Sequence, residues 1–238
     1  DFGANGSPPS HPALLDWLAG ELIGHGWSLK HIHRLILVSH AYRQSAQSRP
    51  TGLARDATTR LLWRFPSRRL SAEAIRDSLL TASGTLDTRI GGPGFKGFEI
   101  VMENVRHYFP KKSYGPPEWR RMVYMTWFRQ EQDEVFGLFD CPDGNQVVSR
   151  RSRSTTPLQA LNLLNGRFVL QQARLFAARV MAEAGNRTPD QVRVAFRLTL
   201  ARSPSPGEAA AAMDLVEQHG LAALGRVLFN TNEFLWLP

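Results

Sequence analysis

Apolar residues recur at helical spacing along most of the chain. Two stretches near the N-terminus each carry a stripe on one helical face, made of Leu14, Leu15, Leu18 and Leu22 in the first, and of Leu29, Ile32, Leu35, Ile36 and Tyr42 in the second. Ser10 and Ser28 stand where N-caps are expected. Leu37 and Val38 widen the second stripe, which predicts a helix buried on most sides.

The same spacing predicts helices through the second half of the chain. Ser71 is placed to cap one that ends before Gly84. The expected helical ranges after the N-terminal pair are 59–63, 71–83, 132–139, 157–164, 168–184, 189–201, 206–219 and 221–229. Core stripes in this half are expected at Val169, Ala173, Phe176 and Val180, and at Leu221, Leu224 and Leu228.

Three helix starts share one capping pattern. A hydroxyl residue is followed by Pro and then by Gln or Glu three positions after the hydroxyl, as in TPLQ from Thr156, TPDQ from Thr188 and SPGE from Ser205. The hydroxyl accepts from the backbone N–H three residues on, and the Gln or Glu reaches back. Proline suits the first helical position. We therefore expect Thr156, Thr188 and Ser205 each to cap a helix.

The middle of the chain breaks the helical pattern. Glycine and proline cluster at 91–94 and 115–117, and short strands are expected at 98–101 and 122–128. The fold class predicted is mainly α, a multi-helix globular domain with an irregular Gly/Pro-rich middle and at most a small β ribbon. We expect one helical domain over 1–238, with a sub-division into 1–90, 91–153 and 154–238. The start at Asp1 suggests a C-terminal fragment of a larger protein.

Charge and cysteine content narrow the function classes. The 238 residues include 29 Lys and Arg against 21 Asp and Glu, a net charge of +8. No block of five like charges appears, so nucleic acid is a partner we do not expect. The single Cys141 excludes an internal disulfide, a haem attachment motif and a multi-cysteine metal site. No apolar run is long enough to span a membrane.

Arg150, Arg151 and Arg153 stand directly before the helix that Thr156 begins. A helix N-terminus favours anions and disfavours cations, so something negative should compensate. An external anion would be held jointly by the three arginines with Thr155, Thr156 and Gln159. The alternatives are an internal carboxylate or plain exposure to solvent.

Glu73 and Asp77 lie four residues apart on one helix face and are the only catalytic candidates. Paired carboxylates can share a proton, bind a cation or do acid–base work. Arg69 and Arg76 lie beside them, however, so a structural network of Arg69, Glu73, Arg76 and Asp77 is the simpler interpretation.

Other residue groups favour structural roles. His31 and His33 point apart on a helix, and His33 and His40 lie about 10 Å apart along it, so we expect no metal site. The aromatic side chains of Tyr124, Trp127 and Phe128 suit stacking on bases or sugars, but such side chains are more often part of a core.

Several motifs together resemble a known family. In chain order they are PSHPALLDWLA from Pro9, GWSLK from Gly26, YRQS from Tyr42, RRLSAEAIRD from Arg68, GGP from Gly91, FDCPD from Phe139, STTPLQAL from Ser154 and NTNEFL from Asn230. They resemble domain of unknown function 1553, the planctomycete cytochrome-c-associated C-terminal domain family.

The resemblance implies context more than chemistry. Such domains end large exported proteins, so we expect an extracytoplasmic location, periplasmic or on the cell surface. Upstream domains of the same polypeptide are the expected partners. No cofactor is expected in this chain, and c-type haem only in other domains. The family brings no established activity, and no roles for its motif residues His11, Glu73, Arg76, Asp77, Thr156 and Gln159.

Three functions remain open at the level of sequence. The first is a helical scaffold or interaction domain of an exported, haem-linked protein, binding an anionic ligand through the arginines at 150–153. The second is a hydrolase acting on polysaccharide, with Glu73 and Asp77 as its acids. The third is a nucleic-acid binder, which requires arginines spread over one exposed face.

Overall fold

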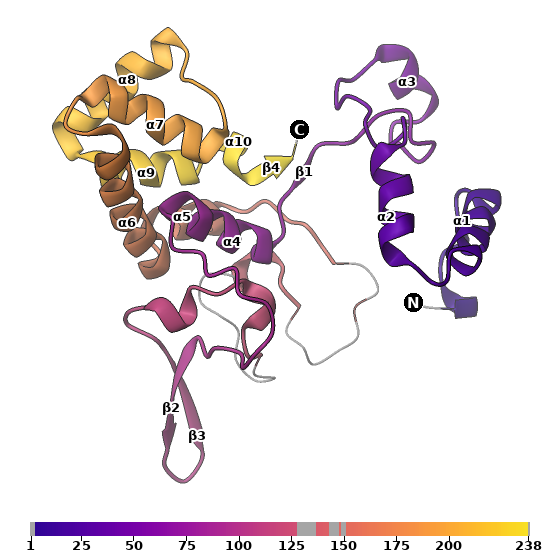
Figure 1. Ribbon diagram of the computed structural model, residues 1–238, viewed down its shortest axis with the longest axis horizontal. Coiled ribbons are helices and arrows are strands. Elements are labelled where there is room, and N and C mark those ends of the chain that lie inside the picture. The colour runs from indigo at the N-terminus through magenta and orange to yellow at the C-terminus, as the bar shows by residue number, and fades with distance from the viewer. Residues whose placement is uncertain (1–2, 128–136, 143–147, 149–150, 238) are drawn as a thin grey trace. The chain divides into compact units, whose positions relative to one another are not determined.

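The computed structural model describes residues 3–127, 137–142, 148 and 151–237. Within them it contains ten α-helices and two small two-stranded sheets (Figure 1). This confirms the predicted mainly helical fold with a small β ribbon. No helix in the described part of the chain is long and apolar enough to cross a membrane.

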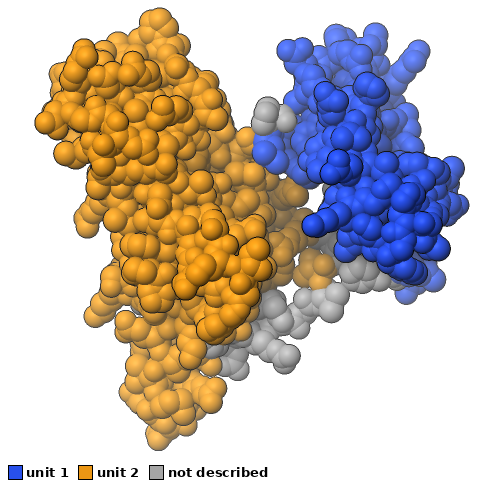
Figure 2. All heavy atoms as spheres, viewed as in Figure 1, with its two compact units in different colours: residues 1–68, 237–238 blue, residues 69–236 orange. Residues whose placement is uncertain are grey.

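The chain forms two compact units, Asp1–Arg68 with Leu237–Pro238, and Arg69–Trp236 (Figure 2). The expected sub-division near residue 90 differs from this boundary. The helix at Ala72–Ser83 packs against the helix at Arg167–Ala184, and this contact places it with the C-terminal part of the chain.

The first unit contains α1 (Pro12–Gly24), α2 (Leu29–Val38) and α3 (Pro50–Arg55). Ser28 caps α2, because its Oγ accepts from the His31 N–H at 3.3 Å, as predicted. The predicted Ser10 cap is wrong. His11 is the N-cap of α1, and the Ser10 hydroxyl lies 2.9 Å from His11 Nδ1 instead.

The predicted helix at 59–63 is also wrong. The Asp56 carboxylate accepts from the Leu61 N–H at 2.6 Å and from the Thr58 hydroxyl at 3.2 Å. Thr59 and Leu62 adopt positive φ angles of 56° and 58°. A short acidic side chain that bonds nearby backbone competes with a helix in this way. The helix lies upstream, at α3, where Pro50 occupies its first turn.

The helices of the first unit are far more exposed than predicted. We expected α2 to be buried on most sides, yet Leu29 is 64% exposed and Val38 60%. Among residues 3–68 only Thr59 is buried. The expectation failed because helical periodicity shows that a face is apolar without showing that another layer covers it.

The second unit carries the other seven α-helices of the described residues and the β ribbon. Its helices are α4 (Ala72–Ser83), α5 (Pro157–Asn165), α6 (Arg167–Ala184), α7 (Thr188–Leu200), α8 (Pro206–His219), α9 (Leu221–Phe229) and α10 (Asn232–Leu235). β2 (Phe98–Met102) and β3 (Arg106–Pro110) form the ribbon, and β1 (Arg68–Arg69) pairs with β4 (Trp236–Leu237).

The ribbon confirms the strand predicted at 98–101. β2 and β3 are antiparallel, with Phe98 opposite Pro110 and Met102 opposite Arg106. The strand predicted at 122–128 is wrong over its first part, which is a 3₁₀ turn at Met122–Tyr124. Asp77 Oδ1 accepts from the Met122 N–H at 2.9 Å and fixes the start of this turn.

Two of the three predicted capping boxes are present. Thr156 and Ser205 each accept from the N–H three residues on, while Gln159 and Glu208 reach back. Ser71 and Gly84 also bound α4 as predicted, with Gly84 in the left-handed region at φ 77°. The Thr188 box is absent, since the Gln191 side chain donates to the Gly185 carbonyl at 2.7 Å instead.

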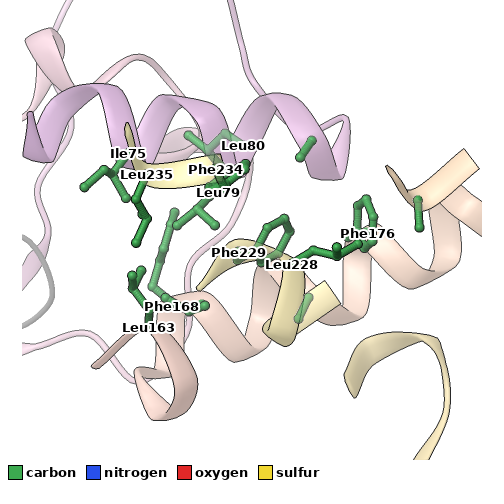
Figure 3. Packing of buried hydrophobic residues seen from close by; sticks show 14 of the residues in the cluster. Ile75, Leu79, Leu80, Leu163, Phe168, Phe176, Leu228, Phe229, Phe234 and Leu235 are labelled. Atoms are coloured by element: carbon green, nitrogen blue, oxygen red, sulfur yellow. The ribbon is translucent and has the colours of Figure 1, made fainter. Parts of the chain in front are cut away.

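α6 lies at the centre of the second unit. It packs against α4, α5, α7 and α9, and its buried face carries the predicted stripe of Val169, Ala173, Phe176 and Val180. Figure 3 shows Phe176 of this stripe within the core, together with Phe229. The predicted stripe on α9 is buried as well. The ring centroids of Phe176 and Phe229 lie 5.3 Å apart in an edge-on arrangement.

The helix predicted at 132–139 falls mostly outside the described residues. Within them, Gly137–Phe139 is a single 3₁₀ turn.

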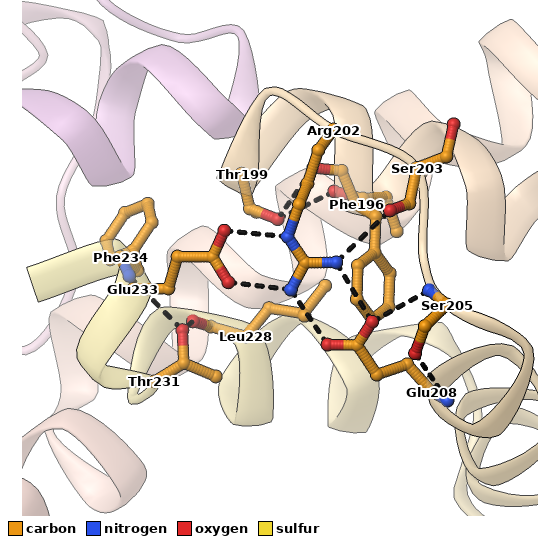
Figure 4. A network of polar contacts seen from close by, with 11 residues as sticks. Phe196, Thr199, Arg202, Ser203, Ser205, Glu208, Leu228, Thr231, Glu233 and Phe234 are labelled. Atoms are coloured by element: carbon orange, nitrogen blue, oxygen red, sulfur yellow. Dashed lines mark hydrogen bonds and ion pairs between the residues drawn. The ribbon is translucent and has the colours of Figure 1, made fainter. Parts of the chain in front are cut away.

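Two salt bridges from Arg202 link the loop after α7 to α8 and α10. The Arg202 guanidinium donates to Glu208 at 2.8 and 2.9 Å and to Glu233 at 2.6 and 2.7 Å (Figure 4). The hydrogen bonds from Arg202, together with those from Ser205, lower the pKa of Glu208 to about 2, and those from Arg202 also lower the pKa of Glu233. The same bonds raise the pKa of Arg202.

Gly225 tests the close packing of α9 on α6. A Cβ there would lie 2.9 Å from Phe176 Cδ1. We expect Gly225→Val to destabilise the fold by about 1–3 kcal/mol through overpacking, measured by urea unfolding. Gly207 in α8 has nothing within 4 Å of its Cβ position, so Gly207→Ala serves as the control. An equal loss in both variants would contradict the packing argument.

The salt bridges of Arg202 predict that the fold loses stability in acid. Glu208 has a lower pKa when folded, about 2, than its ordinary 4.5. The contribution of the Glu208 carboxylate to the free energy of unfolding is therefore present above about pH 4.5 and is lost as the pH falls towards 2. We expect Glu208→Gln to flatten the fall in the urea midpoint between pH 5 and 2. The exposed Glu217 lies on the same helix, and Glu217→Gln should follow the parent profile.

Candidate functional site

Arg69 is the centre of the best-built polar cluster, at the junction of β1, α4 and α5. Its side chain is 4% exposed and donates to the Ser154 carbonyl at 2.5 Å and to Asp140 Oδ2 at 2.6 Å. It also donates to Gln159 Oε1. Gln159, a predicted ligand for an external anion, is thus bound to an internal cation.

Asp140 closes the cluster from the other side. It accepts from the backbone N–H and the hydroxyl of Ser154 at 2.7 and 2.8 Å. Burial raises the pKa of Asp140, but the hydrogen bonds from Ser154 and Arg69 outweigh it and keep that pKa low. The carboxylate is therefore charged and fully engaged at neutral pH.

Arg151 pairs with Glu73. Its Nη1 lies 2.6 Å from Glu73 Oε1, with the two side chains 49% and 28% exposed. Burial raises the pKa of Glu73, and hydrogen bonds from its own backbone and from Arg151 lower it further than burial raises it. The negative partner of Arg151 is an internal carboxylate, which was one of the three predicted alternatives.

Asp77 has a different set of partners from Glu73. It accepts from the Met122 N–H at 2.9 Å and from Arg121 Nε at 3.2 Å, with Arg76 Nη1 at 3.9 Å. Glu73 and Asp77 thus bind different donors, and their role as a catalytic pair stays a prediction.

Arg76 is buried and binds the backbone. Its guanidinium donates to the Arg120 carbonyl at 2.7 Å and to the Glu118 carbonyl. It also lies over two rings, 4.7 Å from the centroid of Phe95 and 5.2 Å from that of Phe168. This combination fixes the 118–120 segment against the core.

Arg120 holds the glycine-rich loop at 91–94 through backbone carbonyls in the same way. It donates to the carbonyls of Pro93, Gly91 and Arg89 and stacks on Tyr124 at 3.9 Å. The loop thus forms a turn around an arginine, with Gly91 and Gly92 at positive φ. Tyr124 packs against the core as part of this arrangement.

The remaining candidates are spread out. Arg150 and Phe128 lie outside the described residues. Arg153 and Thr155 are exposed, while Thr156 is half-buried in its capping box. Trp127 is 39% exposed.

Sequence reasoning missed a groove in the first unit. It has a volume of about 400 Å³ and is lined by Leu14, Trp17, Leu18, Leu35, Ile36, Ser39, Ala41, Tyr42, Leu62, Arg64, Phe65, Pro66 and Arg68. The signal was present, since several of these residues belong to the stripes on 10–23 and 28–42, but those stripes were assigned to a core.

It also missed one group able to hold a metal. Among the described residues, Glu21, His25 and His31 bring three ligand atoms within 4.8 Å of one another. The histidine pairs that were considered from the sequence did not include His25 or Glu21.

Comparison with known proteins gives a family. A family model described as "PSD1: Protein of unknown function (DUF1553)" matches residues 1–216. The chain belongs to the DUF1553 family. No curated protein and no solved structure matches it. The family match confirms the resemblance seen in the motifs, although the motif at Asn230–Leu235 lies beyond the matched range.

Three motifs of this DUF1553 domain meet around Arg69, namely RRLSAEAIRD, FDCPD and STTPLQAL. The RRLSAEAIRD motif supplies the two buried arginines and both carboxylates, and STTPLQAL supplies Ser154 and Gln159. The hydrogen bonds among these residues join segments that are distant in sequence.

Substituting Arg69 tests whether this DUF1553 junction is structural. Arg69→Met leaves Asp140 and Gln159 without their buried donor, so we expect a loss of about 3–5 kcal/mol in unfolding free energy. Arg151→Ala removes a half-exposed pair and should cost at most about 1 kcal/mol. Chemical denaturation would measure both, and similar losses would argue against a buried strut at Arg69.

Proposed function

We propose that this DUF1553 chain is a helical scaffold domain that docks a partner helix in the groove of its first unit. The observation that carries the proposal is the exposure of apolar side chains on α1 and α2. Leu14, Trp17 and Tyr42, all of which line the groove, are 43–51% exposed. Exposed apolar surface in one continuous patch is typical of interaction sites.

The lining of the groove suits a helix. Its walls come from α1, from α2 with residues 39–42 after it, and from the 62–68 segment, and ten of its thirteen lining residues are apolar or aromatic. An amphipathic helix binds such a groove with anchors spaced three or four residues apart. Trp17, Tyr42 and Phe65 supply the large aromatic surfaces that dominate binding energy in interfaces.

The charge of the groove favours an acidic partner. Arg64 and Arg68 are its two charged lining residues. Arg68 lies over the Phe65 ring at 5.2 Å, so its cation is held at the groove. Charge complementarity of this kind selects partners and speeds their association. We therefore propose an amphipathic helix with acidic residues flanking its apolar face as the occupant.

The acids of the second unit support a scaffold rather than a hydrolase. Glu73 and Asp77 bind separate internal donors, as expected of carboxylates with structural roles. Arg69, Arg76 and Arg120 are buried on internal acceptors and are unsuited to nucleic acid. An external anion at Arg153 and Thr155 remains a prediction.

The cellular setting of the proposal comes from the family resemblance alone. We propose that the chain works outside the cytoplasm, next to upstream domains of its own polypeptide, among which c-type haem domains are expected.

Peptide binding tests the docking proposal. The probe is a labelled helical peptide with Leu and Trp on one face and Glu at both ends, followed by fluorescence anisotropy. We expect Trp17→Glu and Leu35→Glu each to weaken its binding at least tenfold. The same peptide with Lys in place of Glu should bind more weakly to the parent, because it would meet Arg64 and Arg68.

The matched control is Leu158→Glu on α5, which changes a residue 60% exposed in the other unit. It should bind the peptide like the parent. Undiminished binding by both groove variants, or no preference for the acidic peptide, would refute the proposal.

A further inference from the structure

We propose that Glu21, His25 and His31 form a zinc site that staples α1 to α2. Glu21 lies in the last turn of α1, His25 directly follows that helix, and His31 lies in the first turn of α2. The site is independent of the docking proposal, because none of the three residues lines the groove.

The distances between the ligand atoms fit one metal ion. Glu21 Oε2 lies 2.9 Å from His31 Nε2 and 3.4 Å from His25 Nδ1. Tetrahedral zinc with bonds of about 2.0–2.1 Å separates its ligand atoms by about 3.3 Å. Both ring nitrogens thus lie close to the same carboxylate oxygen. The two imidazole rings are stacked, with centroids 3.7 Å apart and planes 14° apart, so the His25 ring has to rotate before the nitrogen lone pairs, which lie in the ring planes, point at one ion.

The backbone fixes this arrangement. Gly26 and Trp27 both adopt φ near 62°, and the Trp27 N–H donates to the Leu22 carbonyl at 2.8 Å. The left-handed conformation is uncommon for a residue with a side chain, and such positions cluster at functional sites. The tight turn returns the chain so that the Ser28-capped start of α2 lies beside the end of α1.

The composition of the site suits zinc. Two imidazoles and one carboxylate are a ligand set that zinc takes with water in the fourth position. All three side chains keep some exposure, with His25 51% exposed and the other two about half as much, so a metal and its water have access. His25 Nδ1 also lies 3.0 Å from the Glu21 carbonyl and would turn from it to the metal.

A metal link between α1 and α2 would compensate for the small buried core of the first unit. Small units without a sufficient core add disulfides or metals for stability. Between residues 3 and 68 the structure buries only Thr59. The one cysteine of the chain lies at position 141, in the other unit, so a disulfide cannot supply the link.

Zinc titration by calorimetry on the whole chain tests the proposal. We expect one site per chain in the parent. Glu21→Gln keeps the size of the side chain and removes its charge, and it should weaken zinc binding at least about tenfold. The double variant His25→Gln/His31→Gln should abolish binding at this site. Saturating zinc should raise the melting temperature of the parent, and chelator should reverse the rise.

His33→Gln and His40→Gln are the matched controls, because both side chains are exposed on or next to α2. They should bind zinc like the parent. The proposal is overturned if Glu21→Gln and the double variant, folded as judged by circular dichroism, bind zinc as tightly as the parent. It is also overturned if the parent shows no stoichiometric binding.

Discussion

The second unit depends on donors for the backbone carbonyls of its irregular segments. A buried carbonyl without a partner costs as much as a lost hydrogen bond, and regular structure normally supplies the donor. Between α4 and α5 the described residues contain one short ribbon and a few 3₁₀ turns. Arg69, Arg76 and Arg120 supply the missing donors, each binding carbonyls far away in sequence.

The same solution recurs at helix ends. Arg179 donates to the carbonyls of Thr81 and Ala82 at the end of α4, and Arg226 to that of Leu164 near the end of α5. Arginine suits this role because its planar group offers five donors and stays charged. A cation bound to carbonyls is not neutralised, so a net charge of +8 arises without any requirement for nucleic acid.

The first unit meets a different constraint, since its helices have apolar faces that little else in the unit covers. The two proposals for this unit, a partner helix in the groove and a metal ion at Glu21, His25 and His31, both address this small buried core. A partner helix would cover the apolar faces, and a metal would fix the α1–α2 turn whether or not the partner is bound.

The sequence by itself determined most of the helices, several of their caps and the family. Caps at Ser28, Ser71, Thr156 and Ser205 could be predicted because each uses partners within three residues. The α6 and α9 stripes were predictable because a helix of fixed period has one buried face. The DUF1553 motifs were recognisable because they are contiguous strings.

Only the tertiary structure decided the rest. Gln159 turned out to bind Arg69, 90 residues away, and Gln191 used its amide on Gly185 rather than on a cap. Periodicity marks a face as apolar, but whether α2 is covered depends on elements that no local pattern specifies. Glu21, His25 and His31 come together because the turn at Gly26 and Trp27, both at positive φ, returns the chain, and a positive φ at a residue with a side chain is uncommon and was not predicted for Trp27.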